Sequence, residues 1–64
     1  MSAPAAAPLM HRVPEAAALL NISRSALYEL IRSHQVRSVT VGRTRLITHQ
    51  ALTDYVADLE RQAA

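Results

Sequence analysis

The sequence contains no cysteine, lysine, tryptophan or phenylalanine, and a single glycine among its 64 residues. The absence of cysteine excludes a disulfide framework and any zinc site built on thiolates. The longest uninterrupted apolar run, at residues 16–20, is far too short to span a membrane. Residues 1–8 lack the basic segment and the apolar stretch of a secretory signal, so none is expected.

The apolar content is less able to form a core than its total of 50% indicates, because 12 of those residues are alanine. A chain of this size buries only about 60% of the surface that it exposes when unfolded. A deep catalytic pocket is therefore not expected, and the composition favours a binding module over an enzyme.

The charges are unevenly distributed along the chain. All seven basic residues are arginine, and residues 11–50 hold six of them against two glutamates. Residues 51–64 hold three carboxylates against one arginine. A basic central segment suits a polyanion such as nucleic acid, and the planar guanidinium can grip a phosphate or a guanine with two bonds. The alternative is a solvated charged surface without a ligand.

Residues 13–33 have the pattern of two short helices joined by a tight turn. Pro14 suits the start of a helix over residues 13–20, and Asn21 tolerates the left-handed conformation that ends it. Ser23 is a good N-cap for a second helix over residues 24–33. A three-residue connection of this kind is typical of a helix-turn-helix. The expected buried positions are Ala16, Ala17, Leu19 and Leu20, then Ala26, Leu27, Leu30 and Ile31.

A β-hairpin is predicted directly after the second helix. The β-branched Val36, Val39 and Val41 mark its first strand, Gly42 lies at the turn, and residues 45–47 form its second strand. Arg43 makes the tip basic. A hairpin in this position is the wing of a winged helix-turn-helix.

A third helix is predicted over residues 49–62, with Thr48 as its N-cap. Residues 1–9, which are rich in alanine and proline, are expected to form a disordered tail. The fold class is therefore mostly α with a small β-hairpin, a winged helix-turn-helix of three helices and a two-stranded wing over residues 10–64. The stripe expected to close over the first two helices is Ala51, Leu52, Tyr55, Val56 and Leu59.

The ordered set of motifs resembles the excisionase-type DNA-binding domain, a minimal branch related to the MerR winged helices. Three positions depart from that pattern: Arg12 replaces a threonine cap, Asn21 replaces a turn glycine, and His34 replaces a glycine after the second helix. A positive φ at His34 costs about 1 kcal/mol. The matching residues are Ala16–Ala17, Leu19–Leu20, Ile22–Ser23–Arg24–Ser25, Tyr28, Leu30–Ile31–Arg32 and Val41–Gly42–Arg43.

The resemblance implies a phage or mobile-element excisionase, also called a recombination directionality factor, which carries out no chemistry and needs no cofactor. Such a protein binds repeated attachment-site elements in double-stranded DNA cooperatively, bends them, and directs an integrase toward excision. It would act in the cytoplasm of a bacterial host. Two alternatives stay open: a small MerR-like transcription regulator on promoter repeats, and a protein-interaction or antitoxin-like module whose basic wing is incidental.

The DNA-binding residues are expected on the second helix and on the wing. An α-helix fits the major groove and its N-terminal residues reach base edges, which places Arg24 and Ser25 there. Arg43 at the tip can enter a minor groove or grip its phosphates. The expected set is Ser23, Arg24, Ser25, Tyr28, Arg32, Arg43 and Arg45, with Arg37 as a further phosphate contact.

Several of these residues have a purely structural alternative. Tyr28 can pack against the core, and Arg32 can pair with Glu29 three residues earlier. The three histidines, His11, His34 and His49, are spaced too widely to match a metal-binding motif. No metal site and no catalytic residue is therefore predicted.

Overall fold

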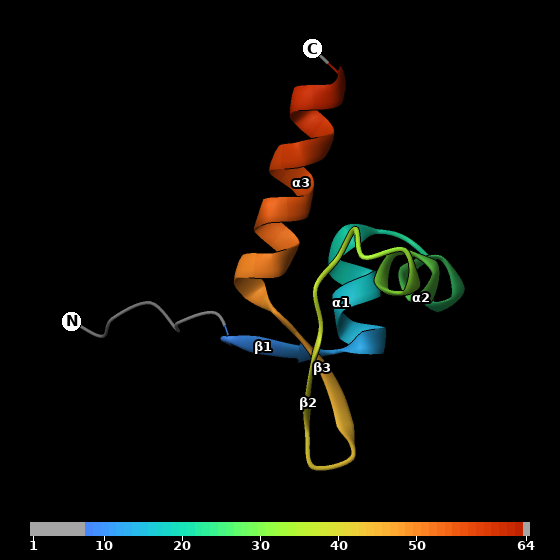
Figure 1. Cartoon of the computed structure of the whole chain (residues 1–64), viewed down its shortest axis with the longest axis vertical. Helices are drawn as coiled ribbons and strands as arrows, with labels where there is room; N and C mark the ends of the chain where they lie inside the picture. Colours follow the sequence, from blue (N-terminus) through green and yellow to red (C-terminus); the bar gives the residue numbers. More distant parts are fainter. Residues whose placement is uncertain (1–7, 64) are drawn as a thin grey trace, which may run out of the picture.

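The computed structural model describes residues 8–63; residues 1–7 of the predicted tail lie outside the described residues. The elements are strand β1 (Met10–Arg12), helices α1 (Val13–Leu20) and α2 (Arg24–Arg32), strands β2 (Val39–Val41) and β3 (Thr44–Thr48), and helix α3 (His49–Ala63). Figure 1 shows the β2–β3 hairpin and the far end of α3 at opposite ends of the molecule. The predicted winged helix-turn-helix is confirmed.

Helix α1 begins without a side-chain cap from Arg12, as the sequence led us to expect. Glu15 strengthens this start, because its Oε1 accepts a hydrogen bond of 3.0 Å from the backbone N–H of Arg12. Pro14 is the second residue of the helix, close to its start as predicted. Asn21 ends the helix with φ of 61°, which confirms its predicted left-handed conformation.

Helix α2 begins at Arg24 with the predicted cap, since Ser23 Oγ accepts a 3.1 Å hydrogen bond from the N–H of Ala26. It ends at Arg32, one residue earlier than predicted. His34 then adopts φ of 63°, the positive value that glycine adopts most easily. Its N–H donates to the carbonyl of Ile31 at 3.1 Å, so the helix end is closed by the strained residue.

The sheet has three antiparallel strands in the order β1-β3-β2, one more than the predicted two-stranded wing. Strand β1 pairs His11 with Ile47, and β2 pairs Thr40 with Arg45. The first hairpin strand is shorter than predicted, because Val36 leaves it and packs in the core. Strand β1 has only 3 residues, too few for an alternating pattern of apolar and polar residues in the sequence. It is recognised from its pairing with β3 in the structure.

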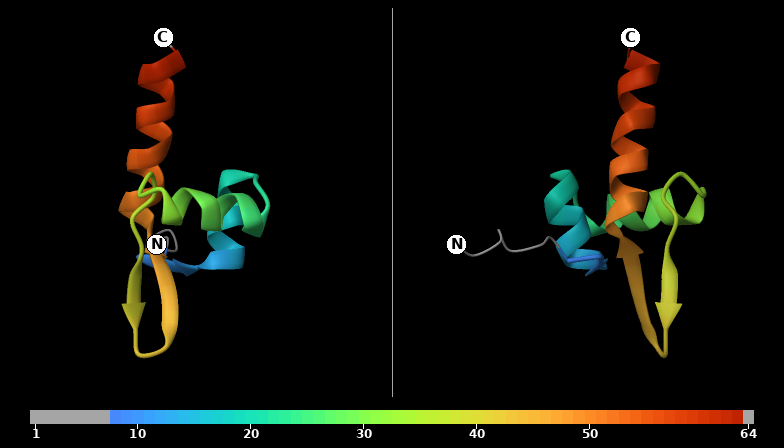
Figure 2. Two further views of the ribbon diagram at one scale, coloured as in Figure 1. Left: turned by 45° about the vertical axis from the view of Figure 1, so that its right-hand side comes forward. Right: turned by 90° about the vertical axis from the view of Figure 1, so that its left-hand side faces the viewer.

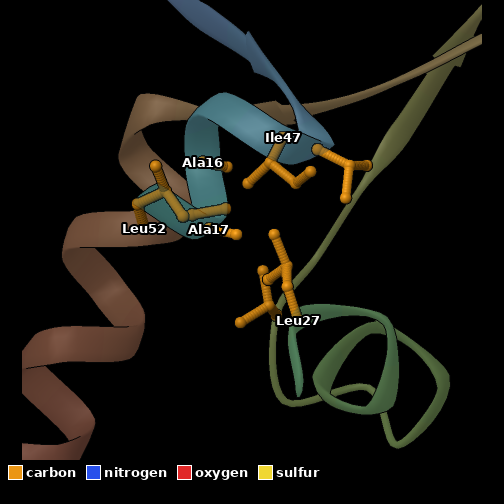
Figure 3. Packing of buried hydrophobic residues seen from close by; sticks show 8 residues of the cluster. Ala16, Ala17, Leu27, Ile47 and Leu52 are labelled. Carbon is orange, nitrogen blue, oxygen red and sulfur yellow. The ribbon is translucent and has the colours of Figure 1, made fainter. Parts of the chain in front are cut away.

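The core forms where α1, α2, β3 and the start of α3 meet. Figure 3 shows Leu27, Ile47 and Leu52 converging on Ala16 and Ala17, whose small side chains allow the elements to approach closely. Leu27 and Ile47 are fully buried. The complete buried cluster is Val13, Ala16, Ala17, Leu27, Val36, Ile47, Ala51 and Leu52.

The predicted closure of the third helix over the first two is only partly correct. Ala51 and Leu52 are buried and Tyr55 packs against the core, but Val56 is 41% and Leu59 is 43% exposed. Helix α3 has 15 residues and α1 has 8, so its second half runs past the helices that could cover it (Figure 2). Leu19, also predicted to be buried, is 59% exposed because it lies off the face formed by Val13, Ala16 and Ala17. Among the described residues, no helix has the length and apolar character needed to cross a bilayer.

Candidate nucleic-acid interface

The start of α2 presents two of the predicted DNA-binding residues to solvent. Arg24 and Ser25 are its first two residues, and both are exposed. The capping bond of Ser23 fixes the backbone of the first turn, from which both side chains project. Leu27 points away from Ser25 and anchors the helix in the core. This arrangement presents the N-terminal turn of α2 outward on a rigid base.

Tyr28 and Arg32 continue the outward face of α2. Tyr28 is 41% exposed, and it is not among the residues that pack against the core. Its ring is therefore accessible, and the alternative in which Tyr28 packs against the core does not apply. Arg32 forms a salt bridge with Glu29, which is the alternative arrangement considered from the sequence. Both partners are well exposed, so the pair contributes little to stability and leaves the guanidinium accessible.

The hairpin presents Arg43 at a two-residue turn. Val41 pairs with Thr44, and Gly42 between them has φ of 62°, as a type II′ turn requires of its first central residue. Arg43 follows at the tip and is exposed. Arg45 lies one pair further back, where its Nη1 donates to Ser38 Oγ at 2.7 Å. Ser38 therefore orients Arg45, a role that the sequence pattern did not indicate.

Arg37 has a partner that sequence reasoning missed. Its Nη2 lies 2.6 Å from Oδ2 of Asp54, on α3. Oδ1 of Asp54 accepts from Gln50 Nε2 at 2.8 Å, so both carboxylate oxygens are engaged. The two partners are 17 residues apart, and no local spacing rule would connect them. The pair links the base of the hairpin to the start of α3.

The structure brings some of the predicted residues together and separates others. Arg37 and Arg45 line one hollow with residues at the end of α2. Arg24 and Ser25 lie at the other end of α2, roughly 12 Å along its axis from Arg32. The predicted residues are therefore spread over α2 and the hairpin and do not form one closed pocket.

The charges on this surface are mostly unpaired. Within residues 8–63 the salt bridges are Arg32–Glu29, Arg37–Asp54 and Arg61–Asp58, so Arg24 and Arg43 have no such partner there. The same part of the chain contains no group of three side chains that could hold a metal ion. The exposed arginines can therefore interact with a polyanion.

Comparison with known proteins identifies the family. A family model described as a helix-turn-helix domain matches residues 12–59. A probable excisionase from Saccharopolyspora erythraea is 42% identical over 50 residues, which cover 78% of this chain and 51% of that protein, so the chain spans about half the length of this relative. An excisionase from Streptomyces ambofaciens is 33% identical over 51 residues, covering 80% of this chain and 82% of that protein. No solved structure matches the chain. The chain thus belongs to the excisionase family of helix-turn-helix DNA-binding proteins.

Proposed function

We propose that this protein is a recombination directionality factor that acts on DNA in the cytoplasm of a bacterial host. Helix α2 lies in the major groove with Arg24 and Ser25 at base edges, and the hairpin tip places Arg43 at the adjacent minor groove. Tyr28, Arg32 and Arg45 contact the phosphate backbone between them. The observation that carries this proposal is the exposure of Arg24 and Arg43, without salt bridges among the described residues, on two elements joined by one core.

One copy presents a single recognition helix, which reads only a few base pairs. Useful affinity must therefore come from several copies on adjacent repeats or from a second protein. We propose that copies bind repeated attachment-site elements cooperatively, bend the DNA, and direct an integrase toward excision. The protein itself contributes binding and no chemical step. The names of the two bacterial relatives support the excision role over a promoter role.

Footprinting on an attachment-site fragment, with and without the integrase of the same element, tests this proposal. We expect protected repeats that fill over a narrow concentration range, and integrase protection that extends when this protein is added. Arg24→Ala should shift the specific footprint to higher protein concentration, whereas Arg61→Ala makes the same charge change on α3 and should leave it unchanged. Protection of promoter repeats without any effect on recombination would instead establish the regulator alternative.

A further inference from the structure

A basic hollow lies between the end of α2 and the base of the hairpin. Its volume is about 280 Å³, and it is lined by Ile31, His34, Val36, Arg37, Ser38 and Arg45. The lining includes two arginines and no carboxylate, so its formal charge is positive. A hollow of this charge suits an anion that can accept from two guanidinium groups.

The two arginines of the hollow are held in position by hydrogen bonds within the protein. Arg45 donates to Ser38 at 2.7 Å and Arg37 donates to Asp54 at 2.6 Å. A guanidinium has five N–H donors, and each of these bonds uses one of them. Each arginine therefore keeps donors for a ligand while its orientation is already restricted, which lowers the entropy cost of binding.

The position of the hollow indicates which anion it would meet. Helix α2 is the element proposed for the major groove and the hairpin is proposed for the minor groove. The sugar-phosphate strand that separates two such grooves must pass between these elements. We infer that the hollow binds one backbone phosphate of the DNA, held by Arg37 and Arg45, and that Asp54 competes with this phosphate for Arg37. This inference rests on the proposed DNA binding and adds a specific phosphate site to it.

The competition follows from the exposure of the ion pair. The side chains of Arg37 and Asp54 are 69% and 52% exposed, and pairs this exposed to water are weak. Asp54 accepts from Arg37 through Oδ2 alone, because its Oδ1 accepts from Gln50. A backbone phosphate can accept two bonds from one guanidinium, so Arg37 gains by exchanging the carboxylate for it. Asp54 therefore orients Arg37 in the free protein and reduces the affinity of the protein for DNA.

The test measures binding to a short duplex of arbitrary sequence at several salt concentrations. Arg37→Ala should make the slope of log K against log salt shallower by about 0.9, the value for one phosphate contact. Asp54→Asn should tighten binding about two- to fivefold, because a surface ion pair of ordinary strength no longer competes. Asp58→Asn is the matched control, since it removes the same charge from the same helix but frees Arg61, which does not line the hollow. Its effect should be clearly smaller.

The double variant Arg37→Ala/Asp54→Asn separates release of Arg37 from a general change in charge. We expect the gain from Asp54→Asn to disappear in the absence of Arg37. An unchanged slope in Arg37→Ala, or equal gains in Asp54→Asn and Asp58→Asn, would overturn the phosphate site alone. If the wild-type protein shows no salt-dependent binding to the duplex, the proposed function fails as well. Thermal unfolding of each variant verifies that the fold is retained.

Discussion

The rings of His11 and His49 meet across the fold, with Nε2 of His11 3.0 Å from Nδ1 of His49. His11 is only 7% exposed, and His49 is the first residue of α3. A second bond reinforces this junction, because the N–H of His49 donates to the carbonyl of Leu9 at 2.8 Å. The histidine pair therefore attaches β1 to the start of α3, in addition to the pairing of β1 with β3.

Loss of this pair should destabilise the fold. His49→Ala removes the hydrogen-bond partner of a buried imidazole, and an unsatisfied buried polar group costs about 1–3 kcal/mol. Urea unfolding monitored by circular dichroism measures the change. Thr53→Ala, at an exposed position on the same helix, serves as the control. If both variants lose the same stability, the histidine bond does not contribute to the fold.

Glycine at position 34 should stabilise the protein. Relief of the positive φ gains about 1 kcal/mol, and the added flexibility of glycine in the unfolded chain returns about 0.5–1 kcal/mol. His34→Gly should therefore raise the free energy of unfolding by up to about 0.5 kcal/mol. Gln35→Gly carries the same entropic cost without this relief, since Gln35 does not have a positive φ. The difference between the two variants is the quantity to measure, and equal losses would show that His34 is unstrained.

Arg24→Ala should reduce affinity for the specific site by about 1–3 kcal/mol and relax its base preference. The reason is that Arg24 begins α2, where side chains reach base edges in the major groove. Competition binding with specific and non-specific duplexes measures both quantities. Equal losses on the two duplexes would show that Arg24 contacts phosphate and does not read a base.

Arg43→Ala should weaken binding to all DNA sequences and reduce the dependence on salt. With four to six phosphates neutralised, the wild-type slope of log K against log salt should be about −4 to −5, and loss of one contact makes it shallower by about 0.9. Fluorescence anisotropy over a series of salt concentrations provides the slope. An unchanged slope in Arg43→Ala would indicate that the hairpin tip does not reach the DNA.

The local elements were predictable because their signals are local. Ser23 caps α2 through a residue three positions away, and Asn21 and Gly42 adopt the positive φ that their residue types tolerate. At His34 the sequence indicated only what a positive φ would cost, and the structure shows that the residue adopts one. The DNA-binding roles of Arg24 and Arg43 also follow from their places in these elements, and they remain predictions.

The order and approximate ends of the helices and the hairpin follow from residue types and their spacing alone, since capping and periodicity act over a few residues. Tertiary contacts decided the rest: the pairing of β1 with β3, the bond between His11 and His49, and the pairing of Arg37 with Asp54. Each joins positions far apart in the chain, so it exists only once the core has brought them together. Tertiary structure also decided that the second half of α3 is exposed, because burial of its apolar residues requires α1 to reach that far along it.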